Sequence, residues 1–488
     1  MKTIRASSLW LMLLVPLSLF AHVGSPDVYY QGQAGPYTVQ ITIRPPQVIP
    51  GVAAIEVRGI SAGISQVEIL PLQMVGPGAK LAPTADVAQR LSNDPQLFTG
   101  KLWIMERGSW KVQIRLDGDK GKGELSVPVA AVSMTSLRMQ KTLGIILSVM
   151  GLLLLLGVIG IIGAANRDAQ LGPAETPSPA KVKSARWRMA AAAVLLAAIV
   201  FFANAWWADE AAANEKLTYK LPHAGASLEA GNVLRLQLEN PNDSVMTQFR
   251  TLRPDRLRLD DLVPDHGHLV HLFLVRMPDM QSFWHLHPSE IQTGIYSASL
   301  PSVPAGDYRV YADIVHRTGF PETQIGEIDL PAVNGQPVSG DDSGEANVIA
   351  SDRTAELADG YRVIWQRDAA PLKASRPYWF RFRIEDKNGQ PASEIESYMG
   401  MAGHAVFMSN DGKIFAHVHP SGSVSMAAFN LAQGPASSNS MSGMLHDAPG
   451  ADVAFLYGFP QAGEYRIFVQ VKRAGQVETA EFIAHVEN

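Results

Sequence analysis

Histidine is the residue type in this sequence whose number and spacing could support chemistry. Thirteen histidines occur among 488 residues, and eight of them lie in or just before two short segments, residues 267–288 and 400–420. Imidazole is the commonest protein ligand for late transition metals, and facing imidazoles offer copper or zinc its nitrogen donors. The sequence therefore predicts metal binding in these two segments.

The two histidine-rich segments are copies of one internal repeat. One reads GHLVHLFLVRMPDMQSFWHLHP and the other GMAGHAVFMSNDGKIFAHVHP, and each is followed by a similar strand, PAGDYRVYADI or QAGEYRIFVQV. We therefore expect two domains of one type, at residues 215–332 and 345–488. The matched positions are His268 with Met401, His271 with His404, His285 with His417, and His287 with His419.

Hairpin geometry predicts that three histidines of each copy share one face. Asp411-Gly412 is a two-residue turn signal, and a turn at this place sets His404 opposite His419. His417 then points to the same face because side chains alternate along a strand. The first copy has a longer turn but nearly the same register, and the equivalent set is His271, His285 and His287.

The absence of cysteine narrows the choice of metal. It excludes thiolate sites, disulfides and cysteine nucleophiles. Copper ranks highest among the divalent ions in the affinity order, and methionine adds a soft donor that favours Cu(I). Met399 and Met401 precede His404 in the sequence. Further candidate donors follow it: Met426, Met441, Met444 and His446. We expect copper, ahead of zinc, at His268, His271, His285, His287, Met401, His404, His417 and His419.

Two alternatives need no metal. A repeated His-x-His-Pro could be a structural hydrogen-bond motif inherited by duplication. The methionines could simply fill gaps in a core, which is their commonest use.

Residues 1–21 are typical of a secretory signal peptide, with basic residues before a short apolar run and a small residue, Ala21, at its end. Leu19 is a less usual residue near a cleavage point, so an uncleaved anchor is the alternative. If cleavage follows Ala21, His22 becomes the N-terminus, and its α-amino group and ring could chelate copper with an oxygen from Asp27. Otherwise His22 is an ordinary terminal residue.

Two longer apolar segments predict a transmembrane helical hairpin. Residues 143–165 and 189–207 are each long enough to cross a bilayer, with a buried core helix as the alternative. The loop 166–188 carries five basic residues against two acidic ones, so the positive-inside rule makes it cytoplasmic. We expect a bacterial cytoplasmic (inner) membrane protein whose flanking domains face the periplasm or cell exterior.

The remaining sequence has the alternation of half-buried strands. Residues 37–43 (YTVQITI) and 109–115 (SWKVQIR) show it most clearly, and they predict a β-sandwich over 22–135. The predicted fold class is therefore mainly β, with three immunoglobulin-like β-sandwich domains plus two transmembrane α-helices. An acidic, Gly- and Ser-rich stretch, 335–345, would link the last two domains.

The segment DHGHLVHLFLVRMPDMQSFWHLHP with PAGDYRVYADI resembles the YtkA-like domains of bacterial exported proteins. Those are similar to the CopC-like copper-binding β-sandwiches of the periplasm. The opening HVGSPDVYYQGQAGPYTVQITIRPP resembles the start of an uncharacterised bacterial membrane protein family. The resemblance implies an immunoglobulin-like fold and copper handling.

The sequence favours a binding protein over an enzyme. It contains no nucleophile elbow, HExxH, phosphate loop or dinucleotide fingerprint, and its net charge of -5 leaves no basic surface for nucleic acid. The leading hypothesis is a membrane-anchored periplasmic protein for copper delivery, buffering or resistance, with a copper-dependent or copper-transporting envelope protein as its partner. The alternatives are a metal-free envelope scaffold and a copper oxidoreductase that uses His22.

Overall fold

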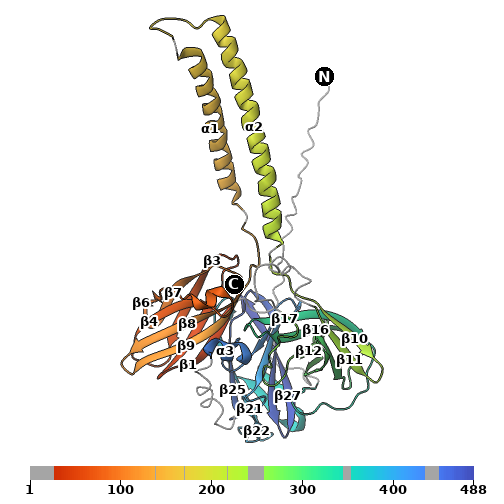
Figure 1. Cartoon of the computed structure of the whole chain (residues 1–488). Helices are drawn as coiled ribbons and strands as arrows, with labels where there is room; N and C mark the ends of the chain where they lie inside the picture. Colours follow the sequence, from red (N-terminus) through yellow and green to blue (C-terminus); the bar gives the residue numbers. More distant parts are fainter. Residues whose placement is uncertain are drawn as a thin grey trace, which may run out of the picture.

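The computed structural model describes residues 27–137, 139–169, 171–216, 218–239, 258–344, 353–434 and 450–488. The predicted signal peptide, the chelate at His22, and the donors Met441, Met444 and His446 lie outside these residues. The described chain is mainly β, with six sheets and a helical hairpin that projects away from them (Figure 1).

The first unit, residues 28–131, consists of two antiparallel sheets around one core. The runs predicted from alternation are strands β2 and β8, which confirms them. On β2, Val39, Ile41 and Ile43 are all buried in this core. One sheet has the order β1 (Val28–Ala34), β2 (Tyr37–Arg44), β3 (Gly51–Gly59), β7 (Asp94–Ile104), β6 (Gln89–Leu91), and the other β5 (Asp86–Val87), β4 (Ile64–Gln73), β8 (Gly108–Gly118), β9 (Gly121–Ala131).

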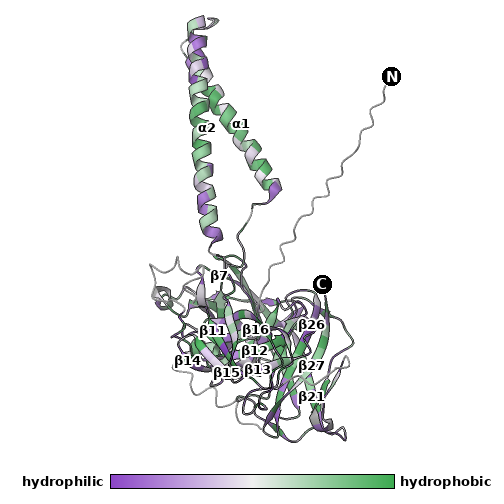
Figure 2. Cartoon of the chain, turned by 90° about the vertical axis from the view of Figure 1, so that its right-hand side faces the viewer, coloured by the Kyte–Doolittle hydropathy of each residue, from purple (hydrophilic) through white to green (hydrophobic). Residues whose placement is uncertain are grey.

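The hairpin consists of α1 (Lys141–Asp168) and α2 (Pro179–Glu215), and both helices are long and apolar enough to cross a membrane. Figure 2 shows the apolar residues along the middle of the hairpin and polar residues near its tip. The connection is shorter than the predicted loop 166–188. Ser178 caps α2, its side chain accepting from the Lys181 N–H, and Pro179 fits the first helical position. The basic residues therefore extend α2 beyond the apolar span.

The second unit, residues 224–330, pairs two four-stranded antiparallel sheets. Its core contains Leu272, Leu274 and Trp284. The sheet orders are β10 (Ala224–Glu229), β11 (Val233–Leu238), β15 (Ile295–Ser299), β14 (Ser289–Gln292), and β13 (Phe283–Leu286), β12 (His271–Arg276), β16 (Gly306–Val315), β17 (Pro321–Leu330).

The third unit, residues 354–487, repeats this plan. Its order β24-β23-β26-β27 matches β13-β12-β16-β17, so the sequence repeat is also a repeat of topology. One sheet has the order β18 (Thr354–Glu356), β19 (Arg362–Trp365), β21 (Tyr378–Glu385), β25 (Asp452–Tyr457), and the other β20 (Leu372–Lys373), β27 (Gln476–Glu487), β26 (Gly463–Arg473), β23 (His404–Ser409), β24 (Phe415–Val418), with β22 (Ile395–Glu396) also on β26.

The two repeated sheets pack against each other through their outer faces. On β12, Leu272 and Leu274 point into the unit's own core, whereas Phe273 and Val275 point to the third unit. Two stacked aromatic pairs cross the boundary with ring centroids 4.2 Å apart, Phe283 with Phe468 and Tyr311 with Phe415. A sheet covered on both faces needs apolar residues on both, which explains why β12 reads HLFLVR without alternation.

Helix α3 (Met426–Gln433) attaches the third unit to the first. Met426 and Phe429 belong to the first unit's core, and the Phe429 ring stacks on Tyr30 with centroids 4.7 Å apart. The Lys111 Nζ donates to the Ala432 carbonyl oxygen at 2.6 Å. Met426 therefore fills a core, as the alternative to metal binding predicted for the methionines.

Truncating Phe468 tests the packing between the repeated sheets. The ring is fully buried, so Phe468→Ala is expected to cost about 3–5 kcal/mol of unfolding free energy and to lower the unfolding temperature of the detergent-solubilised chain. Ile291→Ala is the control, since that side chain is 55% exposed and its loss should change stability by about 0.5 kcal/mol or less. Equal unfolding temperatures for the two variants would contradict this packing.

Candidate metal centre

Eight histidine rings from the second and third units form one continuous cluster at the boundary between them. Strands β12 and β13, the segment before β12 and the residue after β13 supply five, and β23, β24 and the residue after β24 supply three. Neighbouring ring centroids lie 3.9 Å apart for His268–His287, 4.9 Å for His266–His419 and 5.3 Å for His271–His417. The two copies of the repeat therefore face each other across the unit boundary.

The strand register produces this convergence as the turn signals predicted. On β23 and β24, Ala405 pairs with Val418 and Val406 with His417, so the same register sets His404 opposite His419. On β12 and β13, Leu272 pairs with Leu286, which sets His271 opposite His287. These histidines lie on the face of each sheet that the other unit covers, and this is why they are buried.

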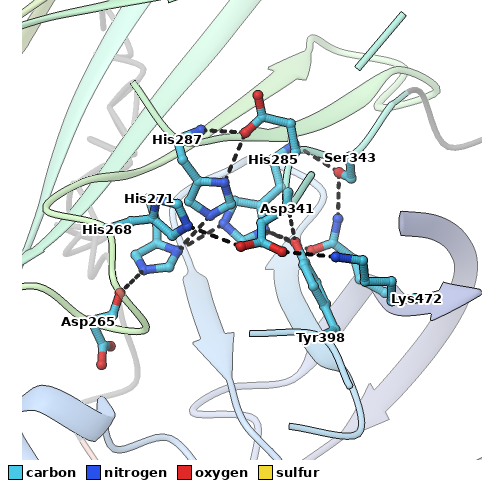
Figure 3. A network of polar contacts seen from close by, with 11 residues as sticks. Asp265, His268, His271, His285, His287, Asp341, Ser343, Tyr398 and Lys472 are labelled. Atoms are coloured by element: carbon cyan, nitrogen blue, oxygen red, sulfur yellow. Dashed lines mark hydrogen bonds and ion pairs between the residues drawn. The ribbon is translucent and has the colours of Figure 1, made fainter. Parts of the chain in front are cut away.

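Three histidines of the second unit, His271, His285 and His287, form a set that we call the second-unit triad (Figure 3). Each ring directs one nitrogen at an oxygen acceptor outside the set. The contacts are His271 Nε2 to the Asp265 carbonyl at 3.1 Å, His285 Nδ1 to Gln470 Oε1 at 2.9 Å, and His287 Nδ1 to Asp342 Oδ1 at 2.9 Å.

These acceptors fix the tautomers of the second-unit triad. A carbonyl or carboxylate oxygen only accepts, so each outward ring nitrogen carries the hydrogen and each inward one carries a lone pair. The Gln470 amide nitrogen is engaged elsewhere, donating to Ser343 Oγ at 2.6 Å, and so the amide oxygen faces His285. An outward hydrogen bond of this kind is how metal-ligating histidines are usually oriented.

On these tautomers the inward nitrogens of the second-unit triad face one another as acceptors. His271 Nδ1 is 3.1 Å from His285 Nε2 and 3.2 Å from His287 Nε2. Metal–nitrogen bonds of ~2.0–2.1 Å place ligand nitrogens of a tetrahedral site ~3.3 Å apart. The two distances to His271 Nδ1 are close to this separation, and the three nitrogens lie within 4.8 Å of one another, so they could hold one transition-metal ion.

A second set, the mixed triad, draws ligands from both units: His266 from the second, and His404 and His419 from the third. Their candidate ligand atoms lie within 4.8 Å of one another. The outward nitrogens of His266 and His419 donate to the carbonyls of Met399 and Val424, at 2.9 and 3.1 Å. The Nε2 atoms of both rings, and both nitrogens of fully buried His404, are buried without a hydrogen-bond partner.

His417 lies between the two triads. Its ring centroid is 5.3 Å from that of His271 and 5.4 Å from that of His404. The Nδ1 atom is 3.5 Å from Asp313 Oδ2, and the buried Nε2 atom has no partner. The repeat predicts His417 as the third member beside His404 and His419, but in the structure His266 takes that position.

Burial favours the neutral, metal-binding form of five imidazoles in the cluster. Burial, reinforced by the neighbouring imidazoles, lowers the pKa values of His271, His285, His404 and His417 well below the ordinary value. Burial also lowers the pKa of His419 to about 3. A ring with such a low pKa stays neutral near pH 7, so protons compete little with a metal ion for its free nitrogen.

Two predicted ligands occupy other positions. His268 stacks on His287 at the rim of the cluster, and its Nε2 is 3.3 Å from Asp341 Oδ2 (Figure 3). The Met401 side chain packs against the first unit's hydrophobic core. His266 is the residue missing from the predicted ligand set, although its place two residues before His268 was a usable signal.

A buried ion pair holds the segment that carries His266 and His268. An isolated antiparallel β-bridge pairs the backbone of Leu262 with that of His316. The His316 Nδ1 donates to Asp261 Oδ1 at 2.8 Å. Burial alone would lower the pKa of His316, but hydrogen bonding and attraction to Asp261 and Glu322 outweigh it and raise the pKa to about 9. His316 is therefore a charged, positioning histidine and not a candidate ligand.

A cavity of about 230 Å³ connects the cluster to the junction of all three units. Its walls include Val28 of the first unit, Asp313 of the second and His419 of the third. Burial raises the pKa of Asp313 to about 7. The cavity therefore borders the cluster, with His271 and His417 also in its walls.

The comparisons with known proteins describe part of the chain. Residues 355–488, in the third unit, match a family model described as a domain of unknown function (DUF8832). No curated protein matches the chain.

Among solved structures, Salmonella alpha-2-macroglobulin reacted with methylamine is 9% identical, with 95% of this chain and 24% of that chain aligned and a TM-score of 0.19. This chain thus spans about a quarter of that protein. A 1.5-MDa bacterial ice-binding adhesin is 6% identical, with 93% and 99% aligned and a TM-score of 0.15. Invasin, a bacterial integrin-binding protein, is 10% identical, with 92% and 60% aligned and a TM-score of 0.14. TM-scores this low identify neither a shared fold nor a shared function.

The stability conferred by His316 should depend on pH. Its pKa is raised above the unfolded value, so its contribution, about 3 kcal/mol, is fully present below about pH 6.5 and disappears as the pH rises through about 9. Metal-free wild-type protein should therefore exceed His316→Gln in unfolding free energy at about pH 6, and the gap should shrink at about pH 9.5. Because the cluster is common to both proteins, the difference isolates His316. A gap that stayed constant would contradict the ion pair.

Proposed function

We propose that this protein is a membrane-anchored copper-binding protein of the bacterial periplasm that serves copper delivery, buffering or resistance. One observation carries the proposal. His271 Nδ1 lies 3.1 Å from His285 Nε2 and 3.2 Å from His287 Nε2, and all three nitrogens lie within 4.8 Å of one another. With the outward nitrogens protonated, these three inward nitrogens carry lone pairs. A small cation satisfies all three at once.

Copper is favoured over zinc by the chemistry of the donors. The centre offers two groups of three imidazoles. It offers no thiolate, because the chain has no cysteine. Among divalent ions, nitrogen sites of this kind bind copper most tightly, and imidazole also suits zinc. Zinc is therefore the competitor that a binding experiment must include.

The resemblance of residues 266–313 to YtkA-like and CopC-like domains agrees with copper handling. On this proposal the paired sheets of each unit are immunoglobulin-like β-sandwiches. The helical hairpin then anchors them at the outer surface of the inner membrane, with the basic end of α2 in the cytoplasm.

Direct binding measurements test the metal proposal. The detergent-solubilised full chain should bind Cu(I) or Cu(II) in equilibrium dialysis, more tightly than Zn(II). His285→Gln removes one inward nitrogen and should weaken copper binding at least tenfold, about 1.4 kcal/mol or more. His485→Gln is the matched control, because the His485 side chain is 72% exposed and lies outside the cluster.

Stability measurements separate this function from that of a metal-free scaffold. Copper at about 100 times its dissociation constant should stabilise the wild type by about 2.7 kcal/mol and His285→Gln by less. If His285→Gln lowers metal-free stability while copper affinity stays unchanged, the cluster is structural and the protein is a scaffold.

The absence of cysteine allows a clean test of topology. A single cysteine at Thr293→Cys lies in an exposed turn of the second unit, and one at Thr176→Cys lies in the connection between α1 and α2. A membrane-impermeant maleimide should label Thr293→Cys in intact spheroplasts and Thr176→Cys only after permeabilisation. The cysteine-free wild type is the blank, and the reverse pattern would refute the proposed orientation.

A further inference from the structure

The histidine cluster contains more nitrogen donors than one ion can use. The two triads supply six rings, and His417 between them supplies a seventh. Zinc sites take four such ligands almost without exception, and copper–nitrogen sites are tetragonal or tetrahedral. Seven clustered imidazoles therefore exceed the coordination shell of a single ion.

The mixed triad has its own unmet requirement for a ligand. His266 Nε2, His419 Nε2 and both nitrogens of His404 are buried with no hydrogen-bond partner. Each such atom costs about 1–3 kcal/mol when left unpaired, and an ion in the second-unit triad would not satisfy them. His417 Nε2 is a further unpartnered atom, and its ring centroid lies 4.8 Å from that of His419 and 5.5 Å from that of His285.

Carboxylates lie beside the histidines of both triads. Asp342 accepts from His287 at 2.9 Å, Asp313 lies 3.5 Å from His417, and Asp341 lies 3.3 Å from His268. Asp265 approaches His266 Nε2 to 4.0 Å. Asp341 also pairs with Lys472 at 3.2 Å, so its charge is already balanced within the protein. Each triad nevertheless has an acidic side chain beside it, Asp342 at the second-unit triad and Asp265 at the mixed triad.

We propose that the cluster is a two-ion copper centre, with one ion in the second-unit triad, one in the mixed triad, and His417 between them. This inference rests on the proposed copper-binding function and adds its stoichiometry and its location across a unit boundary. The first ion is held within the second unit. The second ion binds His266 of the second unit together with His404 and His419 of the third, and so it ties the two units together.

Copper stoichiometry tests the two-ion centre. The full chain in detergent, loaded with Cu(I) and desalted, should retain two copper ions per chain by mass spectrometry of the metal. His287→Gln should reduce this to one by disabling the second-unit triad, and His404→Gln should reduce it to one by disabling the mixed triad. The double variant should retain none, and His485→Gln should retain two. If His404→Gln does not fold, as judged by circular dichroism, His266→Gln replaces it.

Cu(II) spectra provide a second readout. Two ions in neighbouring triads should couple magnetically, so the wild type should give a broadened or weakened paramagnetic resonance signal for its copper content. Each single-triad variant should give the full signal of an isolated Cu(II).

Each outcome bears on a different claim. One copper ion in the wild type, lost in both single variants, would overturn the two-ion centre and leave the proposed function standing. Two ions that neither variant removes would place the copper elsewhere and overturn it as well. No retained copper would refute the proposed function itself.

Discussion

The structure depends on one packing constraint, the burial of the repeated sheets on both faces. Each sheet covers its own core with one face and the other unit with its second face. Phe273, Phe283 and Phe468 hold the apolar part of that contact. The histidines occupy the same faces, and so the packing that joins the units also removes these rings from water. Burial keeps the imidazoles neutral and makes every unpaired ring nitrogen costly.

The protein meets that cost only in part. Oxygens from Asp265, Gln470 and Asp342 take the outward N–H groups of the second-unit triad, and this arrangement aims the remaining lone pairs at each other. A hydrophobic interface thus holds a set of buried histidines whose inner nitrogens contact only one another. Under the proposed function, the free energy left unsatisfied in the metal-free protein becomes part of the affinity for copper.

Asp265 and helix α3 connect the histidine cluster to the first unit. Asp265 accepts the Ala427 N–H at the start of α3 through its side chain, and its carbonyl accepts from His271. Helix α3 in turn inserts Phe429 into the first unit's core. The segment that follows the second histidine copy is therefore an attachment arm, and the cavity that reaches the cluster lies where it joins the three units.

The sequence by itself determined the periodic and local features: the strands from alternation, the apolar helices from length, and the facing of His404 and His419 from the Asp411-Gly412 turn. These depend on neighbouring residues, whose geometry the chain constrains directly. Tertiary structure decided which histidines combine. The mixed triad joins His266 to His404 and His419. Met401 packs against the first unit's core, although the repeat matched it to His268. Those partners lie more than a hundred residues apart, and only the packing of one sheet against the other sets their distance.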